Sequence, residues 1–407
     1  MAMLPVVYIA ITGELPLSTV PYQMYEALSH APLLAVPFFI LTAELMNSGR
    51  ITERLLVLSR ELVGRFRGGL AQMNVVASML FAAMNGSAVA DVAAVGGVLI
   101  PAMKKAGYPA SFAAALTAVG ATIGAIIPPS ILMVLLASTM GLSIGAVFAA
   151  GILPGLLIGL LLMATVYVFA TRRAWQRYEV PFSFLALLHA FLGAWAALLV
   201  PVIIVGGIVF GIFTATEAGA VAAFVAFLIG AFVYRTMSFQ EIRGVLFRSV
   251  KVVSAVFIIL AASGPFSWLL NRIGALQGLE DMLLLFAGNP IAFSLVLIAF
   301  VLAVGTILDP VASIVVLGPT LIGVCVTAGF HEVQAALLLT VGFIMGTVTP
   351  PIGVCYFTAA TIAGERIEKV ARDVLPLLLV LIAVMFLILA VPSLTLTIPK
   401  LLGFVRI

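Results

Sequence analysis

Four acidic residues lie within or at the edge of long apolar segments, where a charged side chain needs a partner: Glu44, Asp91, Glu217 and Asp309. In a membrane helix such a carboxylate costs about 3 kcal/mol or more unless it is paired or binds a cation. Asp91 and Asp309 each follow an interruption of helical character and are expected at matching positions, so either could help to bind an ion or could cap backbone N–H groups. Glu44 and Glu217 lie near segment ends, and a helix N-terminal position alone accounts for Glu217.

The other chemically active residues give no enzyme signature. His30, His189 and His331 are scattered and fall in no metal-ligand spacing. Two membrane aspartates could form the dyad of an intramembrane aspartyl protease, but the contexts AVAD and TILD lack the Gly-x-Gly-Asp typical of that class. Cys325 and Cys355 lie in apolar runs and are too few for a disulfide framework. The sequence therefore argues against an enzyme.

Composition sets the class of protein that holds these acids. The chain is 64% hydrophobic and 9% charged, with a mean hydropathy of +1.29, which is typical of a polytopic membrane protein. Since a helix needs about 20 apolar residues to cross a bilayer, the charge-free runs predict roughly ten to a dozen hydrophobic passes. An all-α membrane domain covering residues 1–407 follows.

The net charge of +4 comes from clustered cations. Seventeen of the twenty Lys and Arg residues fall in five groups, at residues 50–67, 104–105, 172–177, 235–251 and 366–372. By the positive-inside rule these groups are cytoplasmic. The basic residues thus belong at a membrane surface, and nucleic acid is not an expected partner.

The sequence contains an internal repeat. Residues 113–129 (AAALTAVGATIGAIIPP) and 335–351 (AALLLTVGFIMGTVTPP) are identical at eight of seventeen positions. Upstream, residues 91–101 match 309–319 at five of eleven, which requires a four-residue length difference between the two blocks. We expect one unit at 36–140, scaffold helices at 141–263, a second unit at 264–363 and a C-terminal scaffold helix at 364–407. Five crossings between the units invert the second unit relative to the first.

Each unit contains two breaks. The segment MNGSAVAD (84–91) lies between two cytoplasmic basic groups, so the chain must turn inside the membrane as a re-entrant hairpin with its tip at Asn85, Gly86 and Ser87. The corresponding tip is VGTILDP (304–310). The Gly and Pro-Pro residues of the repeat predict a transmembrane helix unwound at mid-membrane. Non-helical backbone at that depth has to be buried in protein or face a wet cavity. Its carbonyls can bind a cation, and the second half-helix can receive an anion. A channel fits this occludable arrangement less well.

Several long segments in order resemble one family: PFFILTAELMN, NGSAVADVAAVGGVLIPAMKKAGY, GATIGAIIPPS, GIFTATEAGAVAA and GTVTPPIGVCYFTAATIAG. Together they are similar to the large membrane (M) subunit of tripartite ATP-independent periplasmic (TRAP) transporters. The resemblance implies a multi-pass protein of the bacterial inner membrane, of the ion transporter superfamily. It also implies sodium-driven uptake of an organic acid, such as a C4-dicarboxylate or sialic acid, by an elevator mechanism. The implied partners are a four-helix small membrane subunit and a periplasmic substrate-binding protein; a sodium-coupled carboxylate transporter without a binding protein is the alternative.

The resemblance also implies sites, carried over by motif position. One sodium ion would bind at Asn85, Ser87, Gly120 and Gly124. The other would bind at Thr306, Asp309, Gly342, Gly346, Thr347 and Thr349. Substrate would lie between the tips, near Gly86, Ser87, Pro128, Pro129, Ser130, Pro350 and Pro351. Asp91 would be a structural or ion-site acid. Members of the family usually begin with a complete first helix, whereas residues 1–12 supply only its last third, so we expect a truncated gene model.

Overall fold

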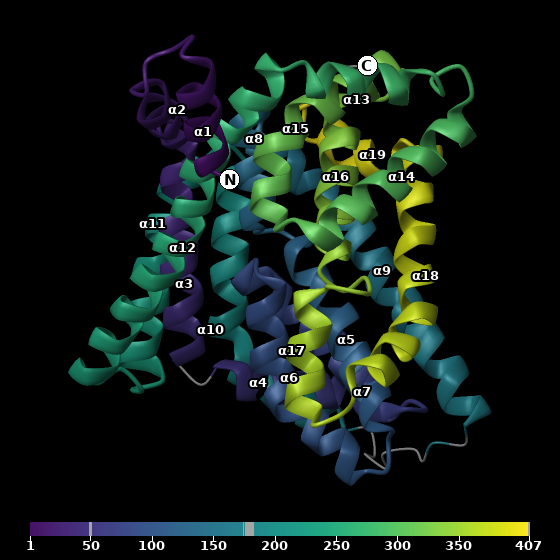
Figure 1. Cartoon of the computed structure of the whole chain (residues 1–407). Coiled ribbons are helices and arrows are strands. Elements are labelled where there is room, and N and C mark those ends of the chain that lie inside the picture. The colour runs from purple at the N-terminus through teal and green to yellow at the C-terminus, as the bar shows by residue number, and fades with distance from the viewer. Residues whose placement is uncertain (49–50, 174, 176–182, 406–407) are drawn as a thin grey trace.

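In the computed structural model every regular element among the described residues is a helix (Figure 1). The structure describes residues 1–48, 51–173, 175 and 183–405; the side chains of residues 51, 52 and 82–85 lie outside the description. Eight helices in the described part of the chain are long and apolar enough to cross a membrane, and shorter apolar helices lie among them. The predicted all-α membrane fold is confirmed.

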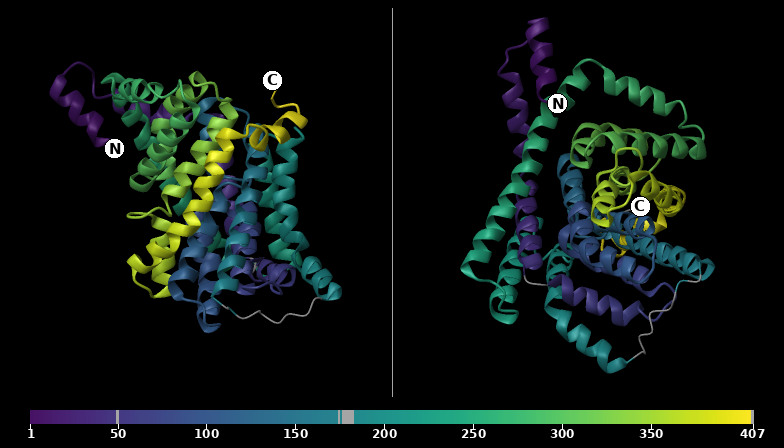
Figure 2. Two further views of the ribbon diagram at one scale, coloured as in Figure 1. Left: turned by 90° about the vertical axis from the view of Figure 1, so that its right-hand side faces the viewer. Right: turned by 60° about the horizontal axis from the view of Figure 1, so that its bottom comes forward.

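The chain begins with helices that lie along one edge of the molecule. These are α1 (Met3–Thr12), α2 (Thr19–Leu28), η1 (Ala31–Leu34) and α3 (Ala35–Ser48). Both α2 and α3 pack against the long α12 (Phe239–Arg272), and the three helices run together along this edge (Figure 2). The amphipathic α4 (Ile51–Val63) then leads into the first repeat unit.

The first repeat unit contains the predicted hairpin and the predicted broken helix. Hairpin one consists of α5 (Gly69–Asn85) and α6 (Ala88–Lys105), separated only by Gly86 and Ser87. The broken helix consists of α7 (Ala110–Ala121), a 3₁₀ turn η2 (Thr122–Ala125), an irregular segment at 126–130 and α8 (Ile131–Met140). The first unit therefore contains two interruptions of helical backbone, one between α5 and α6 and one before α8.

Four long segments join the first unit to the second. They are α9 (Ile144–Arg172), α10 (Phe184–Val209), α11 (Ala215–Leu228), which continues as the π-helical turn η3 (Ile229–Val233), and α12. With the broken helix α7–α8, they make five crossings, the odd number that turns the second unit upside down. In Figure 1, α5 and α6 accordingly lie in the lower half of the molecule, and α14 and α15 in the upper half.

The second unit repeats the first. Its elements are α13 (Ala275–Leu284), hairpin two with α14 (Pro290–Ile307) and α15 (Pro310–Thr327), and a broken helix with α16 (Glu332–Gly346) and α17 (Val354–Ala363). Helices α18 (Ile367–Ala390) and α19 (Ser393–Leu401) close the fold. The inverted repeats predicted from the sequence, each with a hairpin and a broken helix, are confirmed.

The helix boundaries set the register between the two units. Helix α6 and helix α15 both contain 18 residues and begin 222 residues apart, at Ala88 and Pro310. The same interval relates Gly107 to Gly329, which both have positive φ after these helices, and Gly120 to Gly342 in the repeated motif. The expected four-residue length difference between the repeats is therefore wrong.

Candidate functional site

A cavity of about 320 Å³ lies where the four irregular segments approach one another. Its walls come from the tip of hairpin one (86–89), the tip of hairpin two (305–311), the start of α8 (131–132) and the two sides of the second break (344, 346–347 and 352–355). Val252 and Val256 of α12 complete the wall. The cavity thus brings together both repeat units and a helix outside them.

Helix ends give the cavity its electrostatic character. The first residues of four helices, α6, α8, α15 and α17, lie on its wall. A helix N-terminus carries unpaired N–H groups and about half a positive charge, so four of them favour an anion. Helices α14 and α16 instead end at the wall, and their terminal carbonyls favour a cation.

The tip of hairpin one packs directly on the break of its own unit. Gly86 has φ +55°, and a Cβ there would lie 3.1 Å from both the Ile131 nitrogen and the Pro129 oxygen. Only glycine allows this approach without strain. Ser87 is the N-cap of α6, but its hydroxyl makes no capping hydrogen bond, and it lines the cavity. The Asn85 side chain lies outside the described residues.

The tip of hairpin two contains the carboxylate nearest to the cavity. Asp309 is the N-cap of α15, and its Oδ1 accepts a 2.9 Å hydrogen bond from the Val311 N–H. The Thr306 hydroxyl donates to the Leu302 carbonyl at 2.8 Å. Both Thr306 and Asp309 line the cavity, so the tip offers carboxylate and hydroxyl oxygens to a ligand.

Hairpin two and α16 touch through their backbones. A Cβ at Gly346 would lie 2.0 Å from the Gly305 carbonyl carbon, far inside contact distance. Thr347 follows and lines the cavity, while its hydroxyl donates to the Ile344 carbonyl at 2.6 Å. Such a hydroxyl keeps its lone pairs free for a cation.

Other predicted residues lie away from the cavity wall. The residues concerned are Gly120, Gly124, Pro128, Pro129, Ser130, Gly342, Thr349, Pro350 and Pro351. Ser130 is fully buried; its hydroxyl donates to the Ala125 carbonyl at 2.7 Å and accepts from the Met133 N–H at 3.3 Å. The structure therefore uses the Ser130 side chain as the N-cap of α8, and the chain reaches the wall one residue later, at Ile131.

The sequence comparison placed Asp91 and Asp309 at matching positions, and the structure shows that this is wrong. Asp91 lies in the first turn of α6, four residues after the N-cap Ser87, whereas Asp309 is itself an N-cap. In the structural register Asp309 corresponds to Ser87, and Asp91 corresponds to Ser313. The sequence comparison failed because it aligned two aspartates for identity, while the helix starts fix a different pairing.

Sequence reasoning also missed part of the wall. Val252 and Val256 carry no polar atom and belong to a scaffold helix, so no motif marked them. Ile352, Gly353 and Cys355 were quoted within a motif but given no role, although they follow the proline pair directly. Their place after a predicted break was the one signal that could have found them.

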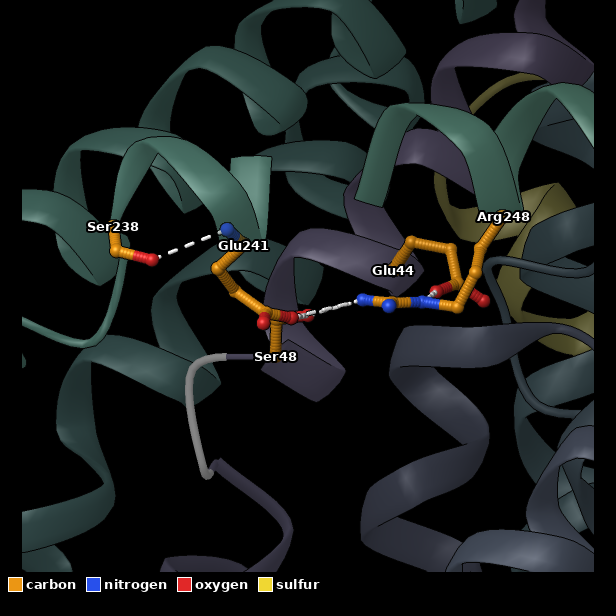
Figure 3. A network of polar contacts seen from close by, with 5 residues as sticks. All are labelled: Glu44, Ser48, Ser238, Glu241 and Arg248. Atoms are coloured by element: carbon orange, nitrogen blue, oxygen red, sulfur yellow. Dashed lines mark hydrogen bonds and ion pairs between the residues drawn. The ribbon is translucent and has the colours of Figure 1, made fainter. Parts of the chain in front are cut away.

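The two remaining acids have structural partners. Glu217 forms a capping box with Thr214 at the start of α11. Glu44 of α3 accepts a 2.9 Å hydrogen bond from Arg248 of α12, and the same guanidinium contacts Ser48 and Glu241 (Figure 3). Both acids therefore brace helices away from the cavity.

Comparison with known proteins places the fold. The family profile described as "Tripartite ATP-independent periplasmic transporter, DctM component" matches residues 1–394. The chain is 34% identical over 404 residues to the sialic acid TRAP transporter large permease protein SiaM of Vibrio cholerae, which covers 98% of this chain and 93% of that protein. It is 36% identical over 389 residues to the C4-dicarboxylate TRAP transporter large permease protein DctM of Pseudomonas aeruginosa, covering 94% and 89%.

A longer relative and a solved structure complete the comparison. The isethionate TRAP transporter permease protein DctMQ of Oleidesulfovibrio alaskensis is 34% identical over 95% of this chain, and the chain spans 61% of that protein. The fold is similar to the crystal structure of the Alcanivorax borkumensis YdaH transporter, with a TM-score of 0.66 and 14% sequence identity. The matched region covers 90% of this chain and 86% of the YdaH chain. That likeness concerns the fold.

Proposed function

The chain belongs to the DctM family of TRAP transporter large permeases, and from this premise we propose that it imports an organic acid driven by sodium. It is a multi-pass inner-membrane protein whose relatives are named as permeases. The observation that carries the proposal is the cavity at which four helices begin and two end. An anion belongs at the four beginnings, and a cation at the two ends.

The organic anion would lie between the two hairpin tips. Its carboxylate would meet backbone N–H groups at the helix starts and the Ser87 hydroxyl, which makes no capping hydrogen bond. The apolar side chains on the wall would cover the rest of the molecule. The relatives' names include sialic acid, C4-dicarboxylate and isethionate, which are all organic anions. This chemistry supports the class of substrate.

Sodium fits the second tip and its neighbouring break. Asp309, Thr306 and Thr347 supply one carboxylate and two hydroxyl oxygens around one side of the cavity, and oxygen ligands suit hard cations. A cation there also offsets the charge of Asp309 beside an anionic substrate. Sodium would therefore bind its site more tightly when the organic anion is present, and the organic anion would bind more tightly when sodium is present.

We infer an elevator motion with the helices outside the two units as the scaffold. The substrate would travel with the hairpins and broken helices, while α12 contributes an apolar wall through Val252 and Val256. Such a wall makes no polar bond that would hold the moving part in place. A four-helix small membrane subunit would complete the scaffold, and a periplasmic binding protein would deliver the solute.

Reconstituted transport tests the proposal. The chain, its small subunit and its binding protein are placed in proteoliposomes, and uptake of radiolabelled sialic acid and succinate is measured. We expect uptake of one substrate only with an inward sodium gradient and the binding protein. Equal uptake with potassium in place of sodium would refute sodium coupling. Sodium-driven uptake without the binding protein would favour the alternative, a sodium-coupled carboxylate transporter that needs no binding protein.

A further inference from the structure

A buried polar cluster lies inside the first repeat unit, behind the cavity. It consists of Asn74 and Ser78 on α5 and Asp91 on α6, with side chains at most 1% exposed. Among the described residues Asn74 Oδ1 has no hydrogen-bond partner, and Ser78 Oγ and the two carboxylate oxygens of Asp91 have none other than each other. Buried polar atoms in native proteins are almost always satisfied, so this cluster needs a partner.

The neighbours bring these oxygens to one place. A Cβ at Gly120 of α7 would lie 3.4 Å from Ser78 Oγ and 3.8 Å from Asn74 Oδ1, so both oxygens face the same glycine. Ser78 is in turn the side chain next to the Asp91 carboxylate. The absent side chain at Gly120 therefore leaves room beside Ser78 and Asn74, and Ser78 in turn contacts Asp91.

Hydrogen bonds fix which end of Asn74 faces the cluster. Its Nδ2 donates a 2.7 Å bond to the Thr117 hydroxyl, and that hydroxyl donates its own proton to the Ala113 carbonyl at 2.8 Å. Because its proton goes to Ala113, the Thr117 hydroxyl accepts the hydrogen bond from Asn74 Nδ2 in this arrangement. The carbonyl oxygen of Asn74 must therefore point away from Thr117, as an acceptor.

Among the described residues, the cluster has acceptors but no cation. None of the ion pairs found in the described part of the chain includes Asp91. Lys104, further along α6, donates a hydrogen bond from its ammonium group to the Ala363 carbonyl. A carboxylate without a partner in a membrane interior is strongly unfavourable. Carboxylate, amide and hydroxyl oxygens together are the ligands of a hard cation.

We propose that the oxygens of Asn74, Ser78 and Asp91 bind a sodium ion inside hairpin one, at a site separate from the two tips. This inference rests on the proposed sodium-driven transport. Asp91 lies one helical turn beyond Ser87, and Ser87 is the residue at the cavity wall. A sodium ion there places positive charge behind the helix start that receives the anion, and it holds α5, α6 and α7 together.

The second unit has no equivalent cluster. In the structural register Asn74, Ser78 and Asp91 correspond to Val296, Phe300 and Ser313. Two of the three oxygen-bearing side chains are replaced by apolar ones, and the carboxylate by a hydroxyl. The inference therefore assigns this ion to the first unit alone.

Equilibrium binding of ²²Na⁺ to the purified chain with its small subunit tests the assignment. We expect Asp91→Asn to bind one sodium fewer per chain at saturation than the wild type. Unchanged stoichiometry and affinity in this variant would overturn the proposal and would mean that a water or a proton satisfies the cluster. If the wild type binds sodium and takes up substrate with it, such a result leaves the proposed function intact.

A second variant keeps the test valid where Asp91→Asn fails to fold. Gly120→Ala puts a methyl group at ordinary contact distance from Ser78 and Asn74, so the fold tolerates it while the ion loses space. We expect sodium affinity at this site to fall about tenfold or more. Gly97→Ala on α6, where a Cβ meets nothing within 4 Å, is the control and should bind like the wild type. Equal sodium binding by Gly120→Ala and Gly97→Ala would overturn the proposal.

Discussion

The two hairpins carry the same two kinds of side chain in opposite order. Hairpin one has Ser87 at its tip and Asp91 one turn later, whereas hairpin two has Asp309 at its tip and Ser313 one turn later. The tip aspartate caps its helix and faces the cavity. The inner aspartate is buried beside the side chains of Ser78 and Asn74. Two repeats with the same backbone fold can thus carry their aspartate at different positions, one at the cavity and one in the protein interior.

Backbone contact in the second unit gives the largest expected effect. Gly346→Ala would put a Cβ 2.0 Å from the carbonyl carbon of Gly305, and neither backbone can rotate away. We expect a loss of about 3 kcal/mol or more and little monodisperse protein by size-exclusion chromatography. Gly323→Ala on α15 meets nothing within 4 Å and should behave like the wild type. Normal yield and uptake for Gly346→Ala would contradict the close contact.

The tip carboxylate gives the next largest effect. Asp309→Asn removes the charge at the cavity but keeps a side-chain oxygen that can cap Val311. We expect the sodium concentration for half-maximal uptake to rise about tenfold or more, while assembly with the small subunit is kept. The measurement is uptake against sodium concentration, with co-purification of the small subunit as the control. Loss of assembly in step with sodium dependence would instead assign Asp309 a structural role.

A smaller effect separates capping from substrate binding in the first unit. Ser130 caps α8 with its hydroxyl, whereas the N-cap of α17 is Gly353, which has no side chain to cap the helix. Ser130→Ala should lower stability by about 1 kcal/mol, seen as a lower melting temperature of the purified complex. The substrate concentration for half-maximal uptake should stay unchanged. A strong rise in that concentration would show that Ser130 contacts the substrate.

The smallest effect is expected at the polar network between α3 and α12. Glu44 and Arg248 are partly exposed, and ion pairs of this kind contribute about 0–1 kcal/mol. Glu44→Gln should therefore change the melting temperature by only a few degrees, with sodium dependence of uptake unaffected. A change in the sodium dependence of uptake would contradict this and would indicate that Glu44 helps to bind the ion.

The sequence was sufficient for the architecture because its signals are local. Charge-free runs indicate spans, glycine and proline pairs indicate breaks, and the short polar segment at 84–91 indicates a turn inside the membrane. These features follow from backbone hydrogen bonding and the thickness of a bilayer. The hairpins, the broken helices and the inversion were all predicted in this way.

The sequence was not sufficient for the details of the site. Aligning Asp91 with Asp309 maximised identity and concealed the exchange of aspartate and serine, because only the helix starts reveal the register. The cluster of Asn74, Ser78 and Asp91 depends on side chains from two helices meeting beside Gly120 of a third. Val252 and Val256 line the cavity only because α12 packs against hairpin two. Contacts of this kind arise from packing.

The half-helices after the two breaks cross between the repeat units. Helix α8 of the first unit packs on α15 of the second, and α17 of the second packs on α6 and α7 of the first. Each repeat thus lends its last segment to the other, as two subunits do in a domain-swapped dimer. Separating the two repeats would break the contacts of α8 with α15 and of α17 with α6 and α7. The cavity therefore cannot open by separation of its two halves. Any movement that carries it has to carry the pair as one body.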